Sequence, residues 1–262
     1  VLTSRGLGDV YKRQRQSWYA EPGANILVAA PSDGDGEGVS TTDNEGGGGY
    51  NNGDYNDNFG GTSSATPLVS GVVALILEAN PNLTYRDVEH IIVHSSRVND
   101  AGDNGWNVNG AGHDVSHKYG FGVIDANAAV ALAENWVNVG PEISYNSGLI
   151  DVADRQIPDN SAPGITEVVN VPDSIKVEHV EVIVDIDHAY RGDLEIVLTS
   201  PSGTQSVLSE KHEDSGNDWN NWMFTSVHHW DEDSFGDWTL TIEDQGNGDT
   251  GTLFDWELNV YG

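Results

Sequence analysis

Hydrophobic and polar residues follow two different patterns along this 262-residue chain. Up to about residue 138, apolar residues recur every three or four positions or form short unbroken runs, as helices and buried strands require. After Pro141 they alternate with polar residues in short stretches separated by turn residues, which is typical of strands with one buried face. The sequence therefore predicts an α/β layer structure followed by an all-β structure.

The first part of the chain predicts three helices and three short strands. The helices are expected at 63–80, from Thr84 onward and at 126–136, and the strands at 26–31, 39–42 and 120–124. The first helix is small and aliphatic along its length, which predicts burial on all sides. Asp87, three residues after Thr84, predicts a capping box, and Asp125 is expected to cap the third helix. The acidic stretches 32–59 and 100–118, rich in Gly and Asn, are otherwise expected to be loops.

Four alternating stretches mark strands in the second part, at 176–184, 194–198, 238–242 and 256–261. Turn sequences such as Ser200–Gly203 and Asn247–Asp249 separate them. Regular short strands with turns between them predict an all-β, jelly-roll-like sandwich. We therefore expect two domains, an α/β domain over residues 15–138 and a β-sandwich over residues 139–262.

The charge of the chain is strongly negative, with 42 acidic and 11 basic residues. Such a surface repels nucleic acids and anionic membranes, so neither is expected as a main partner. We expect no apolar stretch to approach the roughly 18 residues of a membrane span. The chain has no cysteine, so packing or bound metal must supply its stability. A secreted protein, a salt-adapted protein and a calcium-binding protein all fit this composition.

Residues 1–14 do not fit either pattern. They show no helical or strand period and hold three of the eleven basic residues. Residues 9–14 also match the translation of a widely used sequencing-transposon end. We interpret residues 1–14 as a non-native head left by sequence assembly, which implies that the natural gene continues upstream. A genuine disordered basic arm is the alternative.

The segment Gly61-Thr-Ser-Ser-Ala-Thr-Pro67 carries the clearest chemical signal. A reactive serine needs an exposed hydroxyl and backbone N–H groups directed at a forming oxyanion, and a helix N-terminus supplies both. Gly-Thr-Ser alone is a common polar helix cap, but the seven residues and the apolar helix after them favour a nucleophile. Ala65 excludes the Gly-x-Ser-x-Gly elbow of another hydrolase fold. The pattern resembles the serine segment of subtilisin-like proteases, with Ser63 as the nucleophile.

The second part of the chain resembles the P domain, or homo B domain, of kexin- and furin-like proprotein convertases. The resemblance rests on residues 190–204, 229–232, 236–240 and 256–262. Residues 77–88 and 115–126 are also similar to kexin-type catalytic domains. This resemblance implies a partial subtilisin-like layer fold and a secreted, calcium-dependent serine endopeptidase that acts on proteins or peptides. The lack of cysteine points to a bacterial member of the family.

The other members of the catalytic triad are not found. Subtilisin-like enzymes order the triad as Asp, His, Ser, and residues 15–62 are too few to hold the first two segments. The aspartate, the histidine and the oxyanion-hole asparagine are therefore expected upstream, and this chain alone is expected to be inactive. Four histidines are candidates for a substitute base, and none is favoured: His90, His94, His113 and His117.

Four further features admit two interpretations each. By resemblance, Glu21 matches a calcium ligand of the furin family, and the alternative is a solvated carboxylate. The acidic clusters 33–37 and 100–114 could offer oxygen ligands to calcium, but a solvated loop is favoured. Arg191-Gly-Asp193 matches an integrin-binding tripeptide, and a turn before a strand is favoured. The aromatic residues of 219–261 could form a sugar-binding face, and core packing is favoured.

Two functions from different classes remain at this point. In the first, the chain is the C-terminal portion of a kexin-like serine endopeptidase that acts through Ser63. In the second, the chain is a non-catalytic module, in which the P domain binds a partner and the protease segment is vestigial. Motifs for the aspartate and histidine in the upstream gene would favour the first, and a natural start near residue 15 would favour the second.

Overall fold

The computed structural model describes residues 7–11, 15–34 and 37–262. The chain divides into two compact units. The first unit comprises the residues up to Pro22, Ile26–Asn107 and Asp114–Gly140, and the second comprises Gly23–Asn25, Val108–His113 and Pro141–Gly262. The sequence interpretation placed a single boundary at 138/139, and it left out the two short segments that group with the second unit.

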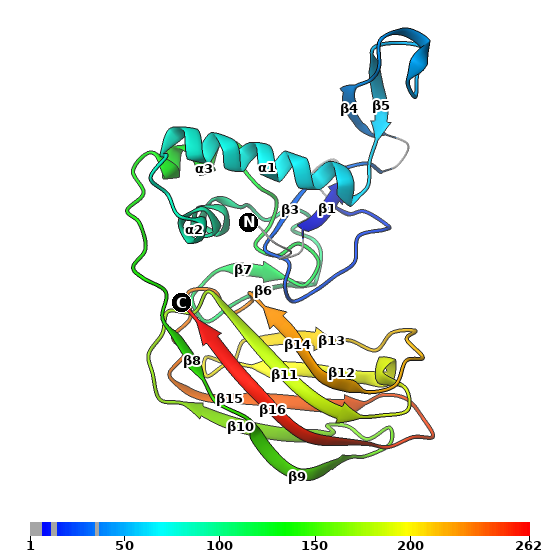
Figure 1. Ribbon diagram of the computed structural model, residues 1–262, viewed down its shortest axis with the longest axis vertical. Coiled ribbons are helices and arrows are strands. Elements are labelled where there is room, and N and C mark those ends of the chain that lie inside the picture. The colour runs from blue at the N-terminus through cyan, green and yellow to red at the C-terminus, as the bar shows by residue number, and fades with distance from the viewer. Residues whose placement is uncertain (1–6, 12–14, 35–36) are drawn as a thin grey trace. The chain divides into compact units, whose positions relative to one another are not determined.

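The first unit combines three helices with short strands (Figure 1). The helices are α1 (Thr62–Ala79), α2 (Tyr85–Ser95) and α3 (Ala126–Ala133), with one 3-10 turn at Gly46–Gly48. The strands are β1 (Leu7–Tyr11), β2 (Arg15–Gln16), β3 (Val28–Ser32), β4 (Val39–Thr42), β5 (Tyr55–Phe59), β6 (Trp106–Val108) and β7 (Asp114–Ser116). Strands β4 and β5 form a hairpin that projects from the rest of this unit, and β6 pairs with β7.

The sheet beside α1 corrects the expectation for the head of the chain. Strand β1 pairs with β3 in parallel, from Leu7 opposite Val28 to Tyr11 opposite Ser32, and β2 pairs with β1. The expectation that residues 1–14 form no regular structure is therefore wrong for residues 7–11. Residues 1–6 and 12–14 lie outside the described part of the chain. The pairing does not test the origin of the segment, which stays a prediction.

Helix α1 is far more exposed than the sequence predicted. Only Ser64, Ala65, Val69 and Ile76 are buried along its length, while Leu75 is 47% exposed. In the first unit, α1 contacts β1, β3, α2 and α3, and these elements leave much of its surface uncovered. The expectation of a helix buried on all sides is therefore wrong. An apolar helix needs a neighbouring element on each face before all of its side chains lose contact with water.

The same helix also corrects the expectation that no segment has the length of a membrane span. By length and composition alone, α1 is the one helix among the described residues that could cross a bilayer. One such helix is weak evidence of insertion, because the core helix of a water-soluble protein passes the same test.

The caps of α2 and α3 are confirmed. The Thr84 side chain accepts a hydrogen bond from the Asp87 backbone N–H, and the Asp87 carboxylate accepts one from the Thr84 backbone N–H. The Asp125 carboxylate accepts hydrogen bonds from the N–H groups of Asn127 and Ala128 at the start of α3. Both caps satisfy backbone donors that the first turn of a helix leaves without partners.

Two strand predictions in the first unit need correction. The segment 120–124 pairs only through isolated bridges, including one between Ala29 of β3 and Val123. Strand β5 falls inside a stretch that was expected to be a loop, because its sequence has little apolar character. A small buried cluster of Ala29, Tyr119 and Val123 nevertheless joins β3 to the segment 120–124, as the two apolar runs predict.

The second unit consists of two antiparallel sheets that enclose one core (Figure 1). One sheet has the order β10–β15–β12–β13, and the other β14–β11–β16–β8, with β9 also paired to β16. The strands are β8 (Ser144–Asn146), β9 (Ile150–Ile157), β10 (Ile165–Val171), β11 (His179–Asp187), β12 (Leu194–Thr199), β13 (Gln205–Ser209), β14 (Trp219–Ser226), β15 (Gly236–Asp244) and β16 (Gly251–Tyr261). A 3-10 turn at Arg191–Asp193 precedes β12, as expected for this tripeptide.

Alternation along the strands builds this core. Every second residue of β11 is buried, from Val180 to Ile186, and the same holds for β12 and β15. Trp230, Trp238 and Trp256 are fully buried, which supports core packing over a sugar-binding face for these three side chains.

Candidate functional site

Ser63 is the second residue of α1, and its side chain is exposed. The helix begins after Gly61, whose φ of 79° lies in the left-handed region that favours glycine. Ser63 therefore lies where the first N–H groups of a helix are unpaired and the helix dipole favours negative charge. Within the described residues, no side chain makes a hydrogen bond with the Ser63 hydroxyl.

The peptide groups around Gly61 are held by side chains from another part of the first unit. The Gly61 N–H donates to Asp33 Oδ1 over 2.6 Å, and the Gly61 carbonyl oxygen accepts from Ser32 Oγ over 2.8 Å. Ser64 adds its own backbone N–H and its hydroxyl to the same carbonyl, at 2.9 and 3.0 Å. Both polar groups of Gly61 are thereby fixed one residue before α1 begins.

Tyr19 completes this arrangement. Its hydroxyl donates a 2.5 Å hydrogen bond to Asp33 Oδ1 and also accepts from the Gly61 N–H over 3.2 Å. The hydrogen bonds from Tyr19 and from the Gly61 N–H lower the pKa of Asp33 below the usual value for an aspartate. Asp33 is therefore ionised at neutral pH. A Cβ atom at Gly60 would overlap the Asp33 carboxylate, so this contact also requires glycine at position 60.

Glu21 does not form a metal centre with its neighbours. It lies on the loop between β2 and β3, and its side chain is exposed. In the described parts of the chain, no two further His, Asp or Glu side chains gather around it. Calcium takes six to eight oxygen ligands, and a single exposed carboxylate supplies at most two of them. The His, Asp and Glu side chains of the described residues therefore show no calcium site at Glu21, and its role as a calcium ligand stays a prediction.

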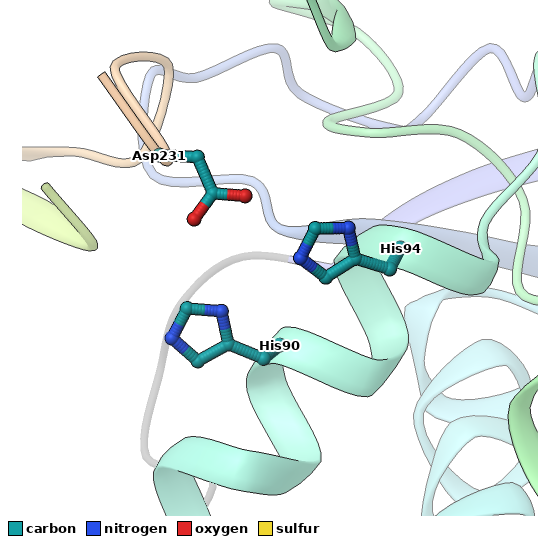
Figure 2. Close-up of side chains that lie close together, drawn as sticks. All are labelled: His90, His94 and Asp231. Carbon is teal, nitrogen blue, oxygen red and sulfur yellow. The ribbon is translucent and has the colours of Figure 1, made fainter. Parts of the chain in front are cut away.

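The four candidate histidines lie elsewhere in the two units. His90 and His94 are one turn apart on α2, with their rings nearly parallel and 6.1 Å between centroids (Figure 2). Trp136 packs beside both rings within the first unit. In the second unit, His113 Nε2 lies 2.8 Å from Asp231 Oδ2. His117 lies in the turn after β7. Within the described residues of the first unit, no hydrogen bond joins His90, His94 or His117 to Ser63.

The two acidic loops differ in what they do. Asp33 holds Gly61, whereas Asp35 and Gly36 lie outside the described residues. In the second loop, Asp103 accepts hydrogen bonds from Lys118 Nζ and the Gly105 N–H, both of which lower its pKa. A polar cavity of about 590 Å³ opens beside it. Its lining residues are Gln16, Asp100, Gly102, Asp103, Asn104 and Tyr119.

The second unit contains a buried carboxylate that the sequence did not single out as a site. Glu232 Oε2 accepts hydrogen bonds from the hydroxyls of Ser200 and Ser202, each over 2.6 Å. Its Oε1 accepts from the Thr204 hydroxyl over 2.5 Å and from the Gly110 N–H over 2.8 Å. All of these partners belong to the second unit. The network ties the turn after β12 to the loop that holds Glu232.

Sequence reasoning missed the residues that support Ser63. It grouped Asp33 with an acidic loop, and it did not single out Tyr19 or Ser32. Asp33 and Gly61 are far apart in the sequence, so no local spacing joins them. Glycine at both positions 60 and 61 was the one available signal, since it indicates a close approach of another group to the backbone.

Each part of the chain is similar to a known protein family. Residues 10–122 match the Subtilase family, and residues 177–260 match the proprotein convertase P-domain. Furin-1 of Xenopus laevis is 40% identical over 214 residues, which cover 79% of this chain and 27% of that protein. Proprotein convertase subtilisin/kexin type 4 of Mus musculus is 36% identical over 268 residues, covering 98% of this chain and 39% of that protein.

A solved structure supports the same relationship. The serine protease of Aeromonas sobria, in complex with the chaperone, is 26% identical with a TM-score of 0.89, covering 98% of this chain and 56% of that one. The chain thus spans only part of each relative named here. The family matches and these relatives together show what each part of the chain is similar to: a subtilase over residues 10–122 and a proprotein convertase P-domain over residues 177–260.

Proposed function

We propose that this chain is the C-terminal portion of a secreted, kexin-like serine endopeptidase in which Ser63 is the nucleophile. The observation that carries the proposal is the position of Ser63, exposed at the start of α1 after a glycine with positive φ. The relatives of residues 10–122 and 177–260 support the same activity. The proposed substrates are peptide bonds of proteins or peptides.

The mechanism assigns each group of the segment a role. Ser63 Oγ attacks the scissile carbonyl carbon, and the carbonyl oxygen gains negative charge as the new bond forms. The backbone N–H of Ser63 donates to this oxygen, helped by the positive end of the helix dipole. A histidine from the upstream portion takes the Ser63 proton and returns it to the leaving amine, and an aspartate orients that histidine. This division of the triad implies that the 262-residue chain is inactive alone.

Covalent labelling of the complete protein tests the proposal. An organophosphonate should modify Ser63 in a protein that includes the upstream portion, and Ser63→Ala should abolish both labelling and peptide hydrolysis. Ser70→Ala is the matched control, because Ser70 is exposed on the same helix and its hydroxyl donates a hydrogen bond to the Thr66 carbonyl. Labelling of Ser63→Ala at the wild-type rate would contradict the assignment. A complete protein that resists labelling would favour a non-catalytic P-domain module.

The proposed dependence on calcium rests on the family resemblance alone. Glu21 would be one ligand of a calcium site whose other ligands lie outside the described residues. We therefore assign no catalytic step to calcium. A bacterial source is also part of this proposal and rests on the absence of cysteine from the chain.

A further inference from the structure

We propose that Asp33 is a positioning residue for Ser63: its carboxylate holds the Gly61 N–H and thereby fixes the start of α1. This inference rests on the proposed function, because it concerns the orientation of the nucleophile. The Asp33 Oδ1 atom lies 2.6 Å from the Gly61 nitrogen and 2.5 Å from the Tyr19 hydroxyl oxygen. One carboxylate oxygen thus joins the loop after β3, the segment around Tyr19 and the first residue before α1.

The helix start needs an anchor of this kind. Gly61 is the N-cap of α1 and makes no side-chain cap, because glycine has no side chain to offer. Glycine adopts positive and negative φ values about equally well, so the residue type alone does not hold Gly61 at its positive φ. Asp33 holds the N–H side of Gly61, and Ser32 holds the carbonyl side. Ser32, the last residue of β3, and Asp33, which follows it, therefore hold both polar groups of Gly61.

This anchor controls where the Ser63 hydroxyl lies. Only two peptide units separate Gly61 from Ser63, and each unit is planar. A rotation at Gly61 is therefore carried directly into the position of Ser63. Misplacing a reacting group by about 1 Å can cost about 100-fold in rate. Ser32, which holds the Gly61 carbonyl, is itself hydrogen-bonded to the buried Ser64 side chain, with 2.7 Å between the two Oγ atoms. This buried contact restrains the hydrogen-bonded residues around Gly61.

The charge of Asp33 strengthens the anchor. A hydrogen bond to an ionised acceptor is about twice as strong as one between neutral groups. Asparagine at position 33 would keep an oxygen acceptor for the Gly61 N–H but would lose that charge. Alanine would remove the carboxylate acceptor and leave the Gly61 N–H with the longer 3.2 Å contact to the Tyr19 hydroxyl. The two substitutions therefore separate the contribution of the contact from the contribution of the charge.

The experiment compares Asp33→Ala, Asp33→Asn and a matched control in the complete protein that includes the upstream portion. The control is Asp43→Asn, because Asp43 also accepts backbone N–H bonds in a loop of the first unit but has no contact with Gly61. We expect Asp33→Ala to lower kcat about 10- to 100-fold with KM and Tm unchanged. Asp33→Asn should lie between Asp33→Ala and wild type, and Asp43→Asn should match wild type.

The outcomes are distinguishable from failure of the proposed function. A wild-type kcat in Asp33→Ala, with hydrolysis intact, overturns the positioning role and leaves Ser63 as the nucleophile. A fall in Tm in Asp33→Ala that matches the loss of kcat also overturns it, because the role would then be stability alone. If the complete wild-type protein neither hydrolyses peptides nor labels at Ser63, the proposed function fails and the inference fails with it.

A second measurement tests the hydrogen bond independently of activity. It follows the NMR chemical shift of the Gly61 amide proton in the 262-residue chain. The same chemical shift in Asp33→Ala as in wild type would show that Asp33 does not accept this hydrogen bond.

Discussion

The Ser200 hydroxyl donates a 2.6 Å hydrogen bond to Glu232, a carboxylate that is only 2% exposed. Burial alone would raise the pKa of Glu232. The imidazole of His229, 3.7 Å from Oε2, and the hydroxyls of Ser200 and Ser202 outweigh burial and hold this pKa at about 2. The second unit therefore keeps a buried negative charge that its hydrogen-bond partners stabilise.

This network predicts acid-sensitive stability of the second unit. The pKa of Glu232 is lower in the folded state than its ordinary value of 4.5, so its contribution is complete above pH 4.5 and is lost as the pH falls toward 2. Hydrogen bonds to a charged group contribute about 1.5–3 kcal/mol, so Glu232→Gln should lower the free energy of unfolding by about that amount at pH 7. Denaturant unfolding at pH 7 and pH 3 measures both effects.

A matched control makes the result specific. Glu243 lies on β15 and is half-buried, and Glu243→Gln should change the free energy of unfolding by about 0.5 kcal/mol or less. The difference between wild type and Glu232→Gln should shrink at pH 3. Equal stability of Glu232→Gln and wild type at pH 7 would show that the network contributes nothing to folding.

The cap of α2 predicts a second stability effect. Asp87 is fully buried and accepts hydrogen bonds from the Thr84 N–H, the Trp136 indole N–H and the Val139 N–H. Since hydrogen bonds to a charged group contribute about 1.5–3 kcal/mol, Asp87→Asn should destabilise the first unit by about that amount. Thr84→Ala should cost about 1–2 kcal/mol, because it removes the cap and the hydrogen bond from the Thr84 hydroxyl to Asp87.

Asp125→Asn is the control for this pair of substitutions. Asparagine caps helices as well as aspartate does, so α3 should keep its cap. The exposed ion pair of Asp125 with Arg97 contributes at most about 1 kcal/mol. Helicity and thermal unfolding, followed by circular dichroism, measure all three variants. A larger loss in Asp125→Asn than in Asp87→Asn would refute the account of the buried cap.

The sequence predicted the features that depend on neighbouring residues. Thr84 and Asp87 are three positions apart, so the capping box follows from local spacing. The strands of the second unit follow from alternation, because successive side chains of a strand point to opposite faces. The start of α1 beside Ser63 follows from a contiguous motif, whereas the role of Ser63 as nucleophile stays a proposal. In each case the pattern and the structural element occupy the same short stretch of chain.

The features that the sequence did not predict depend on residues far apart in the chain. Burial of α1 depends on which elements cover it, and Leu75 stays exposed although its neighbours are apolar. Strand β5 has little apolar character and forms through backbone pairing with β4. Asp33 reaches Gly61 only after β3 and α1 have packed. The spacing of residues within one segment therefore cannot predict any of these three features.

We expect the two units to behave differently when each is expressed alone. The core of the second unit is built from residues between Ile157 and Val260, so residues 141–262 contain it entirely. We expect residues 141–262 to unfold in one cooperative transition, with coincident curves from tryptophan fluorescence and circular dichroism. Residues 15–138 should aggregate, because α1 exposes Leu68 and Leu75 to water. A cooperative, monomeric 15–138 fragment would contradict this expectation.

The isolation of Glu21 predicts how the chain responds to calcium. Glu21 is exposed and has no cluster of further ligands among the described residues, so calcium should bind there weakly if at all. Any rise in Tm of the 262-residue chain with millimolar calcium should therefore be the same in Glu21→Gln as in wild type, because a ligand stabilises only through the site that it occupies and that site would not include Glu21. In the complete protein, if the upstream portion supplies the remaining oxygen ligands, Glu21→Gln should lower the calcium affinity measured by calorimetry. Glu37→Gln, which changes another loop carboxylate in the first unit, should leave that affinity unchanged. A calcium response of the 262-residue chain that disappears in Glu21→Gln alone would show that this chain already holds a complete site.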